Sequence, residues 1–105
     1  MEIIINNTKF EIDKADSFYK RFKGLMLKKE ITKGLFLPKT NSIHTFFMKS
    51  NIDLIMINKR NEVIFYYKNL SKRKIIIKKE AYHTIELPPN SLSKIKLKDK
   101  LTIID

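Results

Sequence analysis

The sequence predicts a mainly β fold, at the margin of the α+β class, that forms a single compact β-barrel-like or sandwich domain over residues 1–105. Short runs of β-branched and aromatic residues recur along the chain and alternate with turn residues, a spacing typical of barrels and sandwiches. Only two glycines and three prolines occur, so no linker or low-complexity segment divides the chain.

Two pairs of strand-like runs are predicted to form β-hairpins. Glu2–Ile5 and Thr8–Ile12 are separated by two asparagines, which favour a tight turn. Leu54–Ile57 and Val63–Tyr67 are separated by a polar and charged tetrapeptide, and this pair is the clearest hairpin in the sequence. The other predicted strands are Leu35–Leu37, Ile43–Met48, Lys74–Ile77, His83–Leu87 and Leu101–Ile104.

One short helix is predicted near residues 16–25. Its apolar residues are spaced i, i+4 and i+7 and therefore lie on one face: Phe18, Phe22 and Leu25. Asp16 or Ser17 can cap its N-terminus, and Gly24 lies near its C-terminus, where a residue with positive φ is favoured.

The composition excludes several chemistries. The absence of cysteine excludes disulfides, thiolate metal sites and cysteine nucleophiles, and we expect neither a cofactor nor a metal site. No apolar stretch is long enough to span a membrane. The first residues, Met1–Asn7, lack the positive charge and the long apolar stretch of a signal peptide, so we expect a cytoplasmic protein.

The net charge of +11 suggests an anionic partner such as nucleic acid. Most of the charge comes from lysine, however, and the only arginines are Arg21, Arg60 and Arg73. Lysine, isoleucine and asparagine have codons rich in A and T, so a base bias explains their abundance. Because base edges and phosphates are usually read by arginine, we expect nucleic-acid binding to be weak and nonspecific if it occurs.

Four blocks of the sequence occur together in the order and spacing of a known family. They are Arg21-Phe22-Lys23-Gly24-Leu25-Met26 with Gly34–Leu37, then Ser42–Asp53, then Ile85-Glu86-Leu87-Pro88, then Lys98-Asp99. From about Ala15 to Ile103 the chain thereby resembles the family called domain of unknown function 192. The resemblance implies a compact, mainly β domain with a short helix, and it implies no known reaction. The family includes exported and unexported members, and this chain is similar to the unexported ones.

The chain departs from the family pattern at four positions. Phe47 stands where the family often has tryptophan, and Asn51 stands where it often has proline. Asn90 replaces a late glycine and tolerates the same left-handed backbone. Lys98 replaces the glycine of the final Gly-Asp.

The candidate ligand-binding residues are Arg21, His44, Met48, Asp53 and Glu86, whereas Gly24, Leu25, Met26 and Gly34 are interpreted as structural. Strand alternation places His44 with Phe46 and Met48 on one face, where Asp53 could approach them. Such a cluster could bind a metal or a small polar ligand. The favoured alternative is that His44 forms a structural hydrogen bond while Met48 fills the core.

Arg21 is expected to pair with a carboxylate, Asp53 first and Glu86 second, either as a buried structural pair or at the anion-binding end of a pocket. His83 and Glu86 are expected on opposite faces of one strand. The aromatic residues among the lysines could stack bases, although alternation favours placing half of them in the core: Phe46, Phe47, Phe65, Tyr66 and Tyr67.

The sequence therefore predicts a non-catalytic binding or accessory module, with a protein or a small molecule as a possible partner and no assigned catalytic residue. One alternative is a small enzyme or ligand-binding protein with a pocket around the candidate residues Arg21, His44, Met48 and Asp53. The other is a nucleic-acid-binding β domain.

Overall fold

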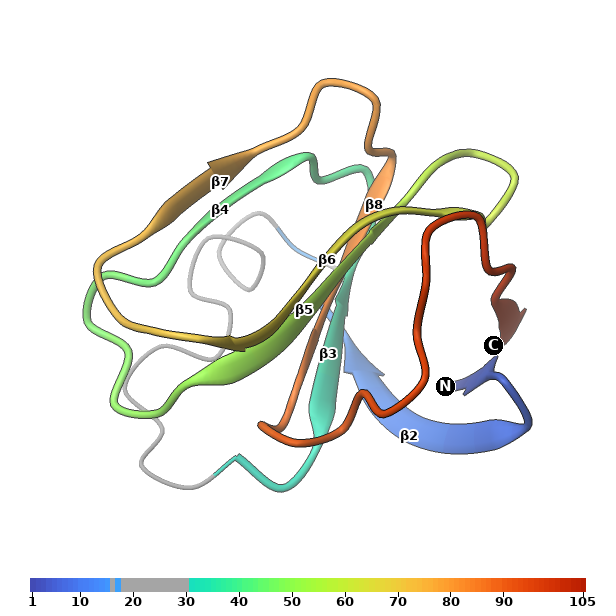
Figure 1. Ribbon diagram of the computed structural model, residues 1–105, viewed down its shortest axis with the longest axis horizontal. Coiled ribbons are helices and arrows are strands. Elements are labelled where there is room, and N and C mark those ends of the chain that lie inside the picture. The colour runs from blue at the N-terminus through green and yellow to red at the C-terminus, as the bar shows by residue number, and fades with distance from the viewer. Residues whose placement is uncertain (16, 18–30) are drawn as a thin grey trace.

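The computed structural model describes residues 1–15, 17 and 31–105, and every regular element in them is a β-strand (Figure 1). The fold is thus mainly β, as the spacing of apolar runs predicts. The predicted helix near residues 16–25 lies outside the described residues, and so do Arg21, Gly24, Leu25 and Met26.

Seven strands form one sheet in the order β6-β5-β8-β3-β2-β1-β9. Their bounds are β1 Glu2–Ile5, β2 Thr8–Lys14, β3 Gly34–Leu37, β5 Ile52–Ile57, β6 Val63–Leu70, β8 His83–Leu87 and β9 Thr102–Ile104. Neighbouring strands are antiparallel except β2 and β3, which are parallel. A second sheet of two antiparallel strands, β4 (Ser42–His44) and β7 (Ile75–Ile77), lies beside it (Figure 1).

Both predicted hairpins are confirmed. In the first, Ile5 pairs with Thr8, and the two turn residues Asn6 and Asn7 have φ values of 49° and 67°. Two consecutive residues with positive φ are typical of the type I′ turn, whose twist matches that of the strands it joins. Asparagine adopts this conformation more readily than other non-glycine residues, which explains why the turn needs no glycine.

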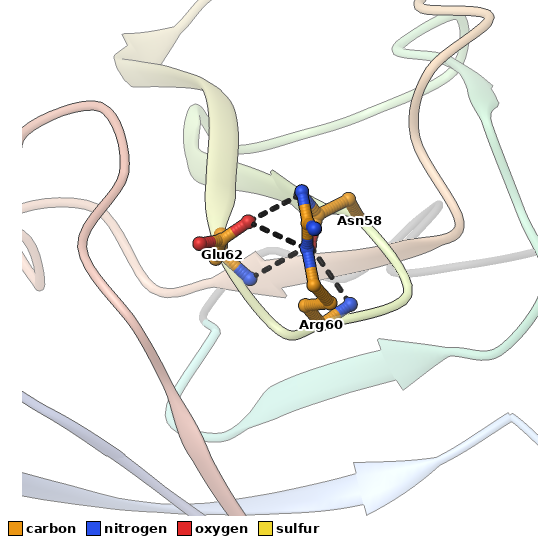
Figure 2. Close-up of polar contacts among 3 residues, drawn as sticks. All are labelled: Asn58, Arg60 and Glu62. Carbon is orange, nitrogen blue, oxygen red and sulfur yellow. Dashed lines mark hydrogen bonds and ion pairs between the residues drawn. The ribbon is translucent and has the colours of Figure 1, made fainter.

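The second hairpin, between β5 and β6, is held by the side chain of Asn58 (Figure 2). Its Oδ1 accepts the backbone N–H groups of Arg60 (2.9 Å) and Glu62 (3.0 Å). Its Nδ2 donates to Glu62 Oε1 (2.9 Å), which also accepts from Arg60 Nε (3.2 Å). The bond from Asn58, together with the positive charge of Arg60, holds the pKa of Glu62 below its ordinary value.

The large sheet is curled like part of a barrel, and the segment that precedes β9 bridges to β6 at the other end of the sheet. Residues 98–101, which precede β9, exchange backbone hydrogen bonds with the start of β6: Val63 N–H to Asp99 O, and Lys98 N–H to Val63 O, both 2.8 Å. The curved sheet encloses one apolar core, whose buried residues are Ile3, Ile5, Ile12, Phe36, Ile55, Ile57, Val63, Ile85, Leu87, Leu92, Ile95 and Leu101.

A second core lies on the opposite face of the sheet. Alternate residues of β5, among them Leu54 and Met56, point to this face, and the small β4–β7 sheet covers it with Ile43 and Ile76. Because both faces of β5 pack against apolar residues, all six residues of that strand are buried.

The predicted strand over Ile43–Met48 ends early, at His44. Its next residue, Thr45, turns into the protein and forms hydrogen bonds with the segment before β7 instead of continuing the strand. Phe47 then has a φ of 65°, which lies outside the range of regular β-strand backbone. The alternation expected through Met48 therefore fails after Phe46, although Phe46 does lie beside His44, with ring centroids 5.8 Å apart.

Candidate functional site

Asp53 is buried, and backbone amides occupy both of its carboxylate oxygens. Oδ1 accepts the N–H of Asn69 (2.8 Å), and Oδ2 accepts the N–H of Leu92 (2.9 Å). Asn69 lies at an irregularity of β6, where two residues of β6 lie opposite the single residue Asp53 of β5. The N–H of Asn69 therefore has no backbone partner in the β5–β6 ladder. The carboxylate therefore joins β5, the irregular end of β6 and the loop after β8.

Among the described residues, the other candidates His44, Met48 and Glu86 are not gathered around Asp53. Met48 belongs to the second core, and Glu86 points to that same face, whereas Asp53 points to the core inside the curved sheet. His44 pairs with Ile75 and lies half-buried on the outer face of the small sheet. The pairing of Arg21 with Asp53 or Glu86 involves a residue outside the described part and stays a prediction.

His83 and Glu86 point to opposite faces of β8, as alternation predicts. The His83 ring packs against Phe36 and Tyr82, with centroid distances of 4.9 and 4.5 Å, and its Nδ1 accepts the N–H of Lys39 (3.0 Å). Burial lowers the pKa of His83, and the positive charges of Lys14 and Lys39 add to this effect. Glu86 is 3% exposed on the other face.

The expectation that Asn90 tolerates a left-handed backbone is confirmed, because its φ is 67°. Lys98, where the family has another glycine, also has a left-handed backbone, with a φ of 73°. Gly34 has a different reason to lack a side chain. A Cβ there would lie 2.7 Å from side-chain atoms of Ile12 and Leu87 and 2.9 Å from the backbone oxygen of Glu86.

The five aromatic residues considered for stacking divide between the cores and the surface. Phe65 packs on the second core, with Lys78 Nζ 4.4 Å from its ring centroid, and Tyr66 packs on the first. Tyr67 is 45% exposed and Phe46 is 39% exposed. Phe47 is the most exposed, at 73%, and it lies on a turn instead of a strand.

An exposed surface combines Phe46 and Phe47 with aliphatic residues of β7 and with the basic residues of the turn before it. On β7, Ile75 and Ile77 are each 62% exposed, because Ile76 alone points toward the second core. Basic residues fill the turn that precedes β7. We define the aromatic–basic surface as Phe46, Phe47, Lys72, Arg73, Lys74, Ile75 and Ile77, all of which are exposed.

Thr45, which sequence reasoning did not single out, joins the two turns that carry this surface. Its Oγ1 donates to Ser71 O (2.8 Å) and accepts the N–H of Lys74 (2.8 Å). Its backbone N–H donates to Lys74 O (2.8 Å), and its carbonyl accepts the N–H groups of Met48 (3.2 Å) and Arg73 (3.3 Å). The two turns lie side by side at the left of Figure 1. No feature of the local sequence distinguishes this threonine, since the partners of its side chain follow it by 26 and 29 residues.

All the charged residues of this surface are basic. Neither segment 42–49 nor segment 71–79 contains an acidic residue, and Lys49, Lys78 and Lys79 flank the aromatic–basic surface. Within residues 1–15, 17 and 31–105, no group of three or more His, Asp or Glu side chains could hold a metal ion. The same residues form no helix that is long and apolar enough to cross a membrane.

Comparison with known proteins gives relatives in sequence and in fold. The model of the family described as "Uncharacterized ACR, COG1430" (DUF192) matches residues 1–103. The chain is 34% identical to UPF0127 protein TK1120 of Thermococcus kodakarensis, over 92% of this chain and 69% of that protein. It is 37% identical to a UPF0127 protein of Thermococcus gammatolerans, but spans only 63% of that relative's length.

Two crystal structures resemble the fold at 16% sequence identity. One is a protein of unknown function from Novosphingobium aromaticivorans, with a TM-score of 0.84 over 98% of this chain and 84% of that one. The other, from Sinorhizobium meliloti, is described as a "putative transcription regulator" and has a TM-score of 0.81 over 96% of this chain and 89% of that one. The family match covers almost the whole chain and agrees with the identities to the archaeal proteins, so this chain belongs to the DUF192 family.

Proposed function

We propose that this protein is a non-catalytic binding module, built as one domain, that holds an anionic partner on the aromatic–basic surface. The observation that carries the proposal is the conformation of Phe47. A bulky residue rarely adopts a φ of 65°, and such strain persists where the surrounding structure imposes it, often at binding sites. Here the strained residue places its aromatic ring in solvent instead of in the core.

The neighbouring residues support the same function. Scattered exposed apolar residues are common, but a contiguous group of them is typical of an interaction surface. Ile75 lies opposite His44 in the β4–β7 register, and the His44 ring packs beside Phe46, so the half-buried imidazole lies between these two exposed apolar residues. The surrounding lysines select for negative charge in the partner.

The geometry of Asp53 gives less support to an enzyme or a ligand pocket around Arg21, His44, Met48 and Asp53. A catalytic carboxylate must reach substrate, whereas Asp53 is buried and both of its oxygens already accept backbone amides. That alternative stays a prediction. A cytoplasmic location, expected from the sequence, is part of the proposal as well.

The test measures binding of the purified protein to three anionic probes: vesicles containing phosphatidylglycerol, a single-stranded oligonucleotide and polyglutamate. We expect at least one probe to bind, and we expect Phe47→Asn to weaken that binding about tenfold or more. Asparagine tolerates the left-handed backbone, so this variant removes the ring while keeping the turn. Its melting temperature should be equal to or above that of the unsubstituted protein, because asparagine relieves the backbone strain.

The matched control is Leu97→Asn, which removes another exposed apolar side chain, 57% exposed, from the segment before β9. Figure 1 shows that segment far from the β4–β7 sheet. The proposal is wrong if none of the probes binds, or if the control weakens binding as much as Phe47→Asn does.

A further inference from the structure

The aromatic–basic surface has a composition that distinguishes between classes of anionic partner. We propose, building on the binding function above, that it docks the protein on the surface of an anionic lipid membrane. The exposed apolar side chains would enter the boundary between headgroups and acyl chains, while the basic side chains remain among the headgroups. Binding of this kind increases with the buried apolar area and with attraction to anionic lipids.

The exposed isoleucines favour lipid over nucleic acid. Phe46 and Phe47 could stack on bases, but Ile75 and Ile77 carry no ring, and each is 62% exposed. A branched aliphatic side chain has no ring to stack on a base and no donor for a phosphate, whereas it gains hydrophobic free energy from acyl chains. Arg73 is the only arginine of the aromatic–basic surface. The surface therefore offers a single guanidinium group that could form bidentate hydrogen bonds with bases.

The charge on the surface also disfavours a second copy of this chain. Two such surfaces face to face would bring Lys72, Arg73 and Lys74 of one copy against the same residues of the other, with no acidic residue in segments 42–49 and 71–79 to compensate. An anionic membrane presents the opposite charge over an extended area and accommodates every basic side chain at once.

Thr45 gives the surface a fixed shape. Its hydrogen bonds connect the turn that carries the phenylalanines to the turn that carries Lys72, Arg73 and Lys74. The phenylalanines and the basic residues are thus held in a fixed arrangement. The backbone of the two turns therefore loses little conformational entropy when the surface docks. The two turns that carry the phenylalanines and the basic residues lie side by side at one end of the molecule (Figure 1).

The test is co-sedimentation of the full chain with large vesicles of phosphatidylcholine alone, or of phosphatidylcholine with about 30% phosphatidylglycerol, in roughly 0.1 M salt. We expect binding to the anionic vesicles only. Ile75→Thr keeps a β-branched residue in the strand and should lower the partition coefficient several-fold. Lys72→Gln with Lys74→Gln should lower it roughly tenfold or more.

Matched controls come from the segment before β9. Lys94→Gln with Lys96→Gln removes the same charge with the same spacing, and Leu97→Asn removes an exposed apolar side chain. Neither should change the partition coefficient more than about twofold, an allowance for screened long-range attraction. Equal losses of vesicle binding in these control variants would overturn the proposal. They would show that the anionic vesicles attract the whole basic protein and not this surface in particular.

The remaining outcomes separate this inference from the binding function itself. If the vesicles do not bind but the oligonucleotide or polyglutamate does, in a manner weakened by Phe47→Asn, the lipid inference is wrong and the binding function stands. If an oligonucleotide binds more tightly than the vesicles and Ile75→Thr has no effect, the surface stacks bases and the lipid inference is again wrong. If none of the probes binds, both are wrong.

Discussion

Asp53 Oδ2 accepts the backbone N–H of Leu92 at 2.9 Å, so a carboxylate in the middle of the chain holds the loop that follows β8. Its other oxygen holds the irregular end of β6. A buried carboxylate is costly unless hydrogen bonds satisfy it, and these two amides are themselves buried or half-buried donors that need acceptors. The motif aspartate therefore has a structural role that its position next to an apolar strand does not reveal.

The first prediction concerns this carboxylate. Asp53→Asn keeps the size of the side chain but replaces one acceptor with an N–H₂ group, which leaves the amide of Asn69 or Leu92 facing a donor. We expect the free energy of unfolding to fall by about 1–3 kcal/mol. Urea denaturation measures it, with the exposed Glu80→Gln as the control. Equal stability of the two variants would contradict the structural role.

The second prediction concerns Gly34. An added methyl group would lie 2.7 Å from side-chain atoms of Ile12 and Leu87, which can shift, but also 2.9 Å from the backbone oxygen of Glu86 in the neighbouring strand, which cannot shift without disturbing the sheet. Gly34→Ala should therefore destabilise the protein by about 1–3 kcal/mol. A thermal melt equal to or above that of the unsubstituted protein would show that the sheet relaxes freely.

The third prediction concerns the two left-handed residues Asn90 and Lys98. Lys98→Gly relieves about 1–2 kcal/mol of backbone strain and costs about 0.5–1 kcal/mol in additional unfolded-state entropy, so we expect a small gain in stability. Asn90→Gly should gain less, because asparagine already tolerates positive φ. Both side chains are exposed, so the comparison isolates the backbone. A larger gain at Asn90 than at Lys98 would refute this account.

The fourth prediction concerns the pH dependence of stability. Burial lowers the pKa of His83 in the folded protein, so the unfolded chain binds its proton more readily. The stability that the neutral ring contributes is complete above the unfolded pKa of about 6.5, and it is lost as the pH falls through the lowered folded-state pKa. Protonation of Nδ1 would also break its bond with the N–H of Lys39.

Urea unfolding between about pH 7.5 and pH 5.5 checks this dependence. His83→Gln keeps a side-chain acceptor for the Lys39 N–H but does not titrate, so part of the loss in stability toward lower pH should disappear. An identical pH profile for the variant would mean that other groups cause the whole effect.

The sequence by itself determined those features that depend on local pattern. Strand runs, the two hairpins, the left-handed Asn90 and the opposite directions of His83 and Glu86 follow from alternation and turn chemistry over a few residues. The motif blocks likewise carry the family resemblance, which the match over residues 1–103 confirms. Each of these features depends on the residues themselves and on neighbours close in the chain.

Only the tertiary structure decided which residues meet. The bridge from residues 98–101 to β6, the parallel pairing of β2 with β3 and the amide partners of Asp53 join segments far apart in the sequence. The early end of β4 has the same origin, because Thr45 forms its bonds with residues 71–74 instead of extending the strand. The exposure of Phe47, Ile75 and Ile77 also depends on which sheet face remains uncovered, and alternation within one strand carries no information about that.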